Sequence, residues 1–203
     1  MNNINLHGLK GRIVRKEDYD YDECRLSWNR AIDSYPKVIV YCSNKEEVAN
    51  NIRWCIENSV QFRIRNGAHN YEGYSTGDDI IVIDLSRMNK INLDEESNMV
   101  TIEGGVRNRR AYDFLCSKGY PFPGGGCPTV GIAGLTLGGG WGYSSRFLGL
   151  ACDSLMEIEF IDYKGNLITA NSNINEDLFW ASKGCGGGNF GVVVSMTFKL
   201  AAK

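Results

Sequence analysis

The sequence predicts a domain of the α+β class whose loops gather around a ligand. Several short apolar runs have the length and the flanking turn residues of β-strands, and only a few segments between them have helical periodicity. Two glycine-rich segments interrupt this pattern, at residues 65–77 and 124–142. No linker, internal repeat or low-complexity tract divides the 203 residues. We therefore expect one domain, or two small subdomains that share a core.

The first expected elements form a β-α-β unit. KVIVYC at residues 37–42 is typical of a buried strand, and residues 61–65 form the next strand-like run. Between them, Ser43 and Glu46 have the spacing of a capping box, which predicts a helix that runs to about Asn58. This order of strand, helix and strand is typical of the β-α-β motif.

The rest of the chain predicts further strands and two helices. DIIVIDL at 79–85 and NMVTIEGG at 98–105 have strand patterns, and a helix is expected from about Asn108 to Ser117, ended by Gly119. LMEIEFIDYKGNLITA at 155–170 predicts a hairpin that turns at residues 164–166. EDLFWAS predicts a short helix, and FGVVVSMTFKL predicts a final strand.

The second glycine-rich segment indicates a site that binds an anion. Nine of the 24 glycines fall between Gly124 and Gly142. Each interior glycine costs a helix or strand roughly 0.5 to 1 kcal/mol relative to alanine, so the stretch is predicted to be a loop kept for its shape. Successive backbone N–H groups in such loops form concave nests that bind phosphate. The segment is therefore suited to a dinucleotide pyrophosphate.

Two common phosphate motifs do not explain these glycines. G-x-x-x-x-G-K-[ST] is absent from the sequence, which argues against a P-loop kinase or ATPase. The dinucleotide fingerprint of the Rossmann fold needs a glycine turn that opens a helix directly after a strand. RNGAHNYEGYSTGDD follows an expected strand but continues as loop, so this context excludes that fingerprint.

Charge and apolar content exclude several kinds of partner. Lys and Arg number 22 against 24 Asp and Glu, and this balance of −2 gives no basis for binding nucleic acid or an anionic membrane. The first residues lack the apolar stretch of a signal peptide, and no apolar run approaches the roughly 20 residues of a membrane span. We expect a soluble cytoplasmic protein.

One cysteine and one histidine lie in unusual surroundings. The seven cysteines include no C-x-x-C pair, so no metal site is expected, and their odd number suits a reducing compartment. Cys42, Cys55 and Cys116 lie in apolar patterns and are expected to be buried. Cys127 instead lies between three glycines and a proline, and His69 lies in the first glycine-rich segment. A lone loop histidine is often only solvated. The combination of the two residues is what indicates a shared site.

Four long stretches carry a resemblance to a known family. They are YPKVIVYCSNKEEV, RIRNGAHNYEGYS, PFPGGGCPTVGIAGLTLGGGWGYSSRFLGLACD and EDLFWASKGCGGGNFGVVVSMTF. From about Pro36 to Leu200 the chain resembles the FAD-binding domain of the vanillyl-alcohol oxidase type, specifically that of the berberine-bridge-enzyme-like oxidoreductases. The resemblance implies a PCMH-type FAD-binding domain of two α+β subdomains with the cofactor between them. Residues 1–35 would be an N-terminal extension, residues from about 36 to 90 the first subdomain, and residues 91–203 the second.

The resemblance assigns cofactor roles to both glycine-rich segments. His69 matches the histidine that attaches to the flavin 8α-methyl carbon, and Cys127 matches the cysteine that attaches to C6, which implies FAD held by two covalent bonds. A neutral imidazole and a thiolate are both nucleophiles that suit such attachment. Further expected cofactor contacts are Arg65, Asn66, Gly67, Ala68, Asn70, Ser75, Pro128, Thr129, Val130, Gly131, Gly134, Leu135, Gly139, Tyr143, Gly191 and Val193. Asn66 departs from the glycine or serine that is commoner at its position.

The resemblance also implies redox chemistry. A doubly attached flavin implies a high flavin potential, suited to oxidising alcohols, hemiacetals or amines, with the cofactor performing the hydride chemistry. Val130 matches a position against the flavin face where dioxygen approaches, and its small side chain predicts an oxidase that produces hydrogen peroxide. The alternative is that Val130 only stiffens the loop backbone. Trp141 is expected either to belong to the core or to border the flavin cavity.

The chain departs from the family in length. Family members run to twice this length or more, with a separate substrate domain after the final strand. We expect the substrate domain and the catalytic base to lie outside this chain, and no catalytic residue is assigned within it. Two functions stay open: the FAD-binding part of an oxidase or dehydrogenase acting on a sugar, alcohol or small secondary metabolite, or a flavin-binding module without turnover. A nucleotide-binding regulator is disfavoured, because a reversible nucleotide site requires neither His69 nor Cys127.

Overall fold

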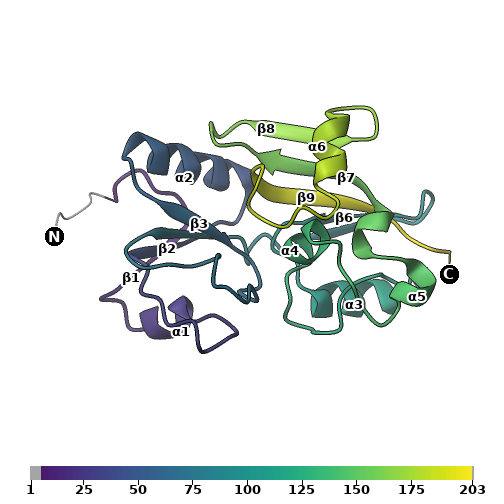
Figure 1. The fold of residues 1–203 in the computed structure, drawn as a ribbon, viewed down its shortest axis with the longest axis horizontal. Coiled ribbons are helices and arrows are strands. Elements are labelled where there is room, and N and C mark those ends of the chain that lie inside the picture. The colour runs from purple at the N-terminus through teal and green to yellow at the C-terminus, as the bar shows by residue number, and fades with distance from the viewer. Residues whose placement is uncertain (1–5, 203) are drawn as a thin grey trace.

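The computed structural model describes residues 6–202 and contains two β-sheets (Figure 1). The first sheet has the strand order β1-β2-β4-β3, formed by Arg12–Arg15, Val38–Tyr41, Ile81–Asp84 and Phe62–Arg65. The second has the order β5-β6-β9-β7-β8, formed by Ile91–Asp94, Met99–Glu103, Val192–Lys199, Leu155–Ile161 and Leu167–Asn171. The predicted α+β class is confirmed.

The first sheet contains the expected β-α-β unit. β2, β4 and β3 run parallel, with β4 inserted between the other two. Helix α2 (Lys45–Glu57) connects β2 to β3 and packs its apolar side chains into the core of this sheet. The helix begins one residue later than the predicted capping box. Asn44 is the N-cap and accepts from the Glu47 N–H, while the Ser43 N–H donates to the Glu47 carboxylate.

The N-terminal segment forms part of the first sheet. β1 pairs antiparallel with β2, and helix α1 (Tyr21–Arg25) follows it. The buried Asn51 of α2 exchanges two hydrogen bonds with the backbone of Lys10, each 2.8 Å long. The described residues before position 36 thus supply an edge strand and are held against the first core.

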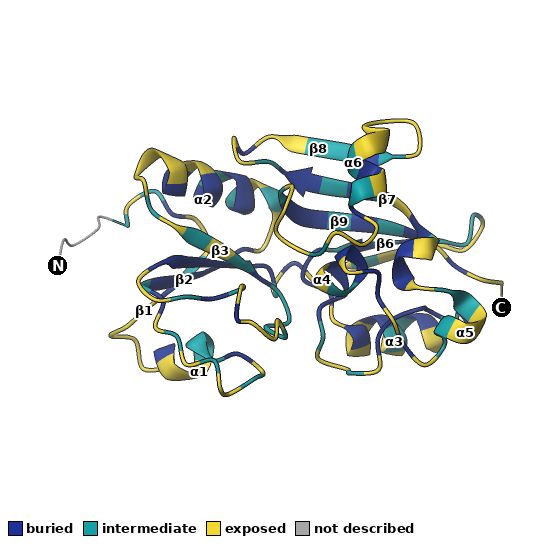
Figure 2. Ribbon diagram, in the orientation of Figure 1, coloured by how far each residue is buried: buried dark blue, intermediate teal, exposed yellow. Residues whose placement is uncertain are grey.

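The second sheet is antiparallel throughout. Strands β7 and β8 form the predicted hairpin, and helix α6 (Glu176–Ala181) follows β8. Helices α3 (Asn108–Cys116) and α4 (Ile132–Leu137) contribute Leu115 and Ile132 to a core with Ile158, Phe160 and Phe198 of the sheet. Figure 2 shows the buried side of α3 and α4 turned toward the strands. Among the described residues, no helix is long and apolar enough to cross a membrane.

Strand β9 serves both cores. Val193 and Met196 belong to the core of the second sheet, whereas Val192 and Val194 pack with the residues of α2 and the first sheet. Alternation of side chains along a strand separates Val193 from Val192 and Val194. The irregular pairing with β7 between Val193 and Ser195 then places Met196 on the same side as Val193. The two subdomains are therefore packed on opposite sides of one strand.

Three local expectations are corrected, and one further strand is present. The second glycine-rich segment is not loop throughout, because α4 occupies the six residues between Gly131 and Gly138, and α5 (Ser145–Leu148) and a 3-10 helix, η1 (Ala151–Ser154), follow. The edge strand β5 is an additional element, with only two apolar residues in its sequence. Cys116 ends α3 on its outer side and is exposed. Trp141 is not in the core: it lies between two glycines and is 68% exposed.

The two subdomains meet at the backbone of Gly104 and Gly105, directly after β6. The Gly104 N–H donates to the Val194 carbonyl and the Gly105 N–H to the Met88 carbonyl, both at 2.9 Å. A Cβ atom on Gly105 would overlap the carbonyl oxygen of Leu85. This contact leaves no room for a side chain, so it fixes where α3 begins relative to the first sheet.

Replacing Gly105 by alanine is expected to destabilise the protein by roughly 1–3 kcal/mol, the usual cost of forcing an extra carbon into a packed interior. Gly134→Ala is the control, because position 134 is helical and a Cβ there meets no atom within 4 Å. The control should be neutral or slightly stabilising. Urea unfolding checks both variants, and equal midpoints for Gly105→Ala and the parent protein would contradict the close contact.

Candidate functional site

The two glycine-rich loops touch each other through their backbones. The His69 loop (residues 66–80) follows β3, and the Cys127 loop (residues 123–131) leads into α4. A Cβ atom on Gly67 would overlap the backbone nitrogen of Gly131 and lie 2.9 Å from the carbonyl oxygen of Thr129. Glycine at position 67 is what permits this approach. The contact brings residues about sixty positions apart into one site.

The side chain of Asn66 stabilises this contact between the two loops. Its side-chain amide donates to the Gly104 carbonyl at 2.6 Å, at the junction of the two subdomains. The same side chain lies where a Cβ of Gly131 would be, so Gly131 also has to lack a side chain. The side-chain oxygen of Asn66 is buried and has no hydrogen-bond partner in the described structure. Asparagine, in place of the glycine or serine commoner in the resembled family, thus has a structural role here.

The loops bring His69 and Cys127 to a single hydroxyl group. His69 Nε2 lies 2.8 Å from Thr129 Oγ1, and Cys127 Sγ lies 3.5 Å from the same oxygen. Partial burial lowers the pKa of His69, and the Arg107 cation acts in the same direction. The Thr129 hydroxyl lowers the pKa of Cys127, as do the backbone N–H groups of Thr129 and Val130. Both shifts favour the nucleophilic forms, the neutral imidazole and the thiolate.

Trp28 covers one face of the His69 ring. The two ring centres are 5.1 Å apart and the planes differ by 23°, which is a stacked arrangement. The backbone N–H of Trp28 donates to the Ala68 carbonyl at 2.9 Å, and Ala68 has a φ of +58° in the left-handed region. Trp28 was not among the expected site residues. Nothing in its local sequence marks it, because its role depends on the tertiary position of the N-terminal segment.

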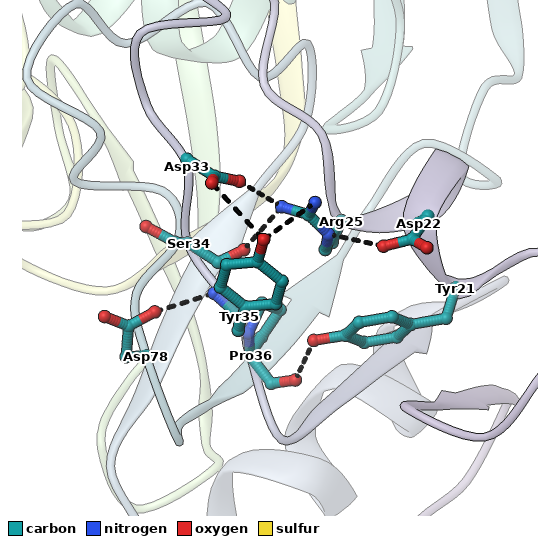
Figure 3. A network of polar contacts seen from close by, with 8 residues as sticks. All are labelled: Tyr21, Asp22, Arg25, Asp33, Ser34, Tyr35, Pro36 and Asp78. Carbon is teal, nitrogen blue, oxygen red and sulfur yellow. Dashed lines mark hydrogen bonds and ion pairs between the residues drawn. The ribbon is translucent and has the colours of Figure 1, made fainter.

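A polar network built on Arg25 holds this N-terminal segment in shape (Figure 3). The guanidinium donates to Asp22 at 2.9 Å and to Asp33 at 2.5 Å, and it lies 4.0 Å from the centre of the Tyr35 ring. The Arg25 side chain is only 11% exposed, so the network is more constrained than a typical surface pair. Asp22 and Asp33, the two acidic partners of Arg25, lie on either side of the loop 26–32, which includes Trp28.

The same network reaches the far end of the His69 loop. The Tyr35 N–H donates to the Asp78 carboxylate at 2.7 Å, and the Asp79 N–H donates to the Tyr35 carbonyl at 3.1 Å. Tyr21 donates its hydroxyl to the Pro36 carbonyl at 2.7 Å (Figure 3). The His69 loop is therefore tied to the N-terminal segment at residue 68 and at residues 78–79.

A cavity of about 540 Å³ opens beside His69 and Thr129. Arg65 and Asp84, at the ends of β3 and β4, form a buried ion pair at 2.6 Å on its wall. Nη2 of Arg65 donates to the Tyr41 hydroxyl at 3.4 Å, and Nη1 has no partner in the described structure. The other charged side chains of the wall are Arg12, Asp20, Glu23, Arg30 and Arg107. A second cavity of about 610 Å³ also borders Thr129 and Arg107 and is lined by Arg109 and Arg110 as well.

The unpaired buried atoms around the loops fit a ligand with many polar groups. They include donors and acceptors, since Arg65 Nη1 can only donate and Asn66 Oδ1 can only accept, while the hydroxyls of Ser27 and Ser75 can do both. Buried polar atoms are normally paired. FAD, with phosphates, sugar hydroxyls and ring carbonyls, offers partners of both kinds. Among the described residues no cluster of three His, Cys, Asp or Glu side chains is placed to bind a metal.

The remaining expected contacts are spread over a wider area. Asn70 accepts from the N–H groups of Glu72 and Tyr74 and so shapes the His69 loop. Tyr143 is exposed, lies against Gly126 and meets Trp141 edge to face at 6.2 Å. Pro128 and Gly134 are exposed, Val130, Leu135 and Gly191 are partly buried, and Gly139 is buried with a φ of +100°. Val193 is buried in the core of the second sheet, so its side chain contacts other apolar residues.

Comparison with known proteins identifies the family. Residues 36–171 match the family described as FAD binding domain. The chain belongs to this family. An uncharacterized FAD-linked oxidoreductase of Bacillus subtilis is 47% identical over 195 residues, which cover 94% of this chain and 43% of that protein. The chain thus spans less than half the length of such relatives.

Solved structures place the chain among the berberine-bridge-enzyme-like proteins. The wild-type BBE-like 1 protein of Physcomitrella patens superposes with a TM-score of 0.91 at 31% identity, covering 95% of this chain and 42% of that one. The glucooligosaccharide oxidase of Acremonium strictum, described as carrying a 6-S-cysteinyl, 8α-N1-histidyl FAD, superposes with a TM-score of 0.87 at 28% identity, covering 93% and 40%. The predicted family and the PCMH-type fold are confirmed.

Removing the ring of Trp28 is expected to raise the pKa of His69 toward its ordinary value of about 6.5, because burial of the imidazole is what lowers it. A pH titration of the His69 ring signals by NMR measures the shift, with His69→Ala used to assign them. Trp28→Phe should retain part of the effect, and Trp180→Ala, an exposed tryptophan on α6, is the control. An unchanged His69 titration in Trp28→Ala would contradict the role given to this stacking.

Proposed function

We propose that this chain is the FAD-binding part of an oxidase that acts on a sugar, alcohol or small secondary metabolite, with FAD attached through both His69 and Cys127. The observation that carries the proposal is the convergence of these two side chains on the hydroxyl of Thr129, at 2.8 and 3.5 Å. The oligosaccharide oxidase among the structural neighbours, with its cysteinyl and histidyl FAD, supports it. The small-molecule substrate would be bound mainly by parts of the protein outside this chain.

The residues of this chain would hold and orient the cofactor. His69 would attach to the 8α-methyl carbon and Cys127 to C6, and the glycine backbone of both loops would line the cofactor closely. Arg65 would supply a donor, and Asn66 an acceptor, to the polar parts of the ligand. Once bound, FAD supplies the hydride chemistry of the reaction.

Covalent attachment at His69 or Cys127 requires an oxidant, and dioxygen would balance its atoms and electrons. One flavin C–H bond and one S–H or N–H bond would be replaced by a C–S or C–N bond. The two hydrogens and their two electrons would pass to dioxygen, which would become hydrogen peroxide. The same acceptor would serve turnover in an oxidase.

The small side chain of Val130 supports dioxygen as the electron acceptor. It is partly buried, its N–H donates to the Cys127 carbonyl at 3.4 Å and its carbonyl accepts from the Asn108 N–H at 3.0 Å, so its position beside Cys127 is fixed by the backbone. Valine is one methylene smaller than leucine, and in a closely packed interior a difference of one methylene can leave a small cavity. We propose that this leaves space for dioxygen next to the flavin.

A flavin-binding module without turnover is the alternative function. The site geometry described above would serve either role, because it concerns cofactor attachment alone. Flavin reduction by candidate sugars or alcohols distinguishes the two: reduction supports the oxidase, and a flavin that no such substrate reduces supports the module.

Intact-protein mass spectrometry under denaturing conditions should show a mass increase of one FAD. The increase should persist in His69→Ala and in Cys127→Ala, since either bond alone retains the cofactor, and disappear in the double variant. Cys185→Ala is a control, because Cys185 is exposed and belongs to neither loop. An unmodified mass together with a flavin that acid extracts would reject covalent attachment and leave FAD binding intact.

Val130→Leu should slow the reoxidation of reduced flavin by air and leave its reduction nearly unchanged, because the added methylene fills the space proposed for dioxygen. Stopped-flow mixing of dithionite-reduced protein with oxygenated buffer measures the rate. Val130→Ala, which enlarges the space, should reoxidise at least as fast as the parent. Equal rates in the parent and Val130→Leu would show that Val130 does not control access.

A further inference from the structure

Thr129 has one hydroxyl group for two neighbours. His69 Nε2 lies 2.8 Å from it and Cys127 Sγ lies 3.5 Å from it, the second distance being ordinary for a bond that involves sulfur. A hydroxyl carries a single hydrogen and two lone pairs. It can donate to only one of the two neighbours, so the hydrogen positions at His69 and Cys127 are linked through it.

Only one arrangement of hydrogens bonds both side chains to the hydroxyl in their reactive forms. If the hydroxyl donates to sulfur, it supports the thiolate, and it then accepts a hydrogen from Nε2 of a neutral imidazole. The imidazole then carries its hydrogen on Nε2, and the lone pair of Nδ1 is free to react with the flavin. In the opposite arrangement the hydroxyl donates to Nε2, the proton sits on Nδ1, and sulfur keeps its own hydrogen. Neither nucleophile is then available, because Nε2 is occupied and the thiol is protonated.

We propose that Thr129 is the positioning residue for both flavin attachments: its hydroxyl accepts from His69 Nε2–H and donates to Cys127 Sγ, which fixes the imidazole tautomer and stabilises the thiolate. This inference rests on the proposed function for its consequence, and it goes beyond that function by assigning the coupling between the two sites to one side chain. Thr129 itself forms no covalent bond to the flavin in this scheme.

The surroundings of the three residues act in the same sense. Trp28 covers one face of the imidazole, and Arg107, on the wall of the same cavity, disfavours an imidazolium. The other charged side chains of this cavity are Glu23 and Arg30 and two pairs, Arg65 with Asp84 and Arg12 with Asp20. Arg109, Arg110 and Asp113 line the second cavity, which also borders Thr129. No carboxylate among the described residues makes an ion pair with His69 that would hold it protonated.

The test compares Thr129→Val with Thr129→Ser. Valine has nearly the shape of threonine and lacks the hydroxyl, whereas serine keeps the hydroxyl and lacks the methyl group. A role in packing would make serine the more damaging change. A role in hydrogen bonding makes valine the more damaging one, and circular dichroism checks that each variant keeps its fold.

The first readout is the reactivity of Cys127 in flavin-free protein. Iodoacetamide labelling followed by peptide mass spectrometry gives a rate for each cysteine, and Cys116 and Cys185, both exposed, serve as references in the same sample. Thr129→Val should slow labelling of Cys127 about fivefold at pH 7, as expected for the loss of one modest hydrogen bond to the thiolate. The midpoint of its pH profile should move upward. Thr129→Ser should match the parent, and the two references should not change.

The second readout is the tautomer of His69. Nitrogen-15 NMR distinguishes a protonated Nε2 from a protonated Nδ1, and the chain has only one other histidine, His7. The parent and Thr129→Ser should show the hydrogen on Nε2. A hydrogen on Nδ1 in the parent would overturn the proposed arrangement. Equal Cys127 reactivity in the parent and in Thr129→Val would overturn it as well.

The intact mass separates this inference from the proposed function. If the parent carries covalent FAD, Thr129→Val should form both attachments more slowly while Thr129→Ser keeps the parent rate. If the parent never carries covalent FAD, the proposed function fails, and the thiol and tautomer readouts still decide the role of Thr129. Should Thr129→Val not fold, Thr129→Ala against Thr129→Ser provides the same comparison.

Discussion

The site depends on one steric condition, the contact of the Gly67 backbone with that of Gly131. The first residue belongs to a loop that leaves the first sheet, and the second begins a helix that packs on the second sheet. A β-carbon on Gly67 would overlap the Gly131 nitrogen, and one on Gly131 would overlap the Asn66 side chain, so either would force the loops to shift. The hydrogen bonds from His69 and Cys127 to Thr129 tolerate only tenths of an ångström. The relative placement of the two subdomains and the chemistry at the site are therefore set by the same contact. Asn66 reinforces it by linking the His69 loop to Gly104.

The candidate site has a third wall that comes from the N-terminal segment. Trp28 lies on the His69 ring and bonds to Ala68 through its backbone, and the Arg25 network ties the segment to Asp78 and Asp79 at the far end of the His69 loop. None of these contacts involves a strand or a regular helix beyond α1. Single ion pairs at a surface contribute little, but several partners on one nearly buried guanidinium restrict a loop much more than one pair does. The environment of the histidine thus depends on residues forty positions earlier in the chain.

The sequence predicted most of the elements because their patterns are local. The strand at 37–42, the helix before Asn58 and the hairpin turning at 164–166 all follow from apolar periodicity and turn residues, which act within a few positions. The helix inside the second glycine-rich segment was missed because the low helix propensity of glycine outweighed the apolar residues at 132, 133 and 137, which are buried in the core of the second sheet. His69 and Cys127 were found from their unusual flanking residues. Trp28 and the bridging role of Thr129 were not, because both depend on distances between segments that no local pattern encodes.

The shared strand β9 has a consequence for synthesis of the protein. It is the last strand in chain order among the described residues, and both cores need its side chains, Val193 and Met196 for one and Val192 and Val194 for the other. A chain emerging from the ribosome can close neither core until residues 192–199 are free, although the loops with His69 and Cys127 have been exposed for some time by then. Domains that fold during translation usually complete their N-terminal part first. Here folding of both halves, and with it assembly of the cofactor site, has to wait for the same late segment.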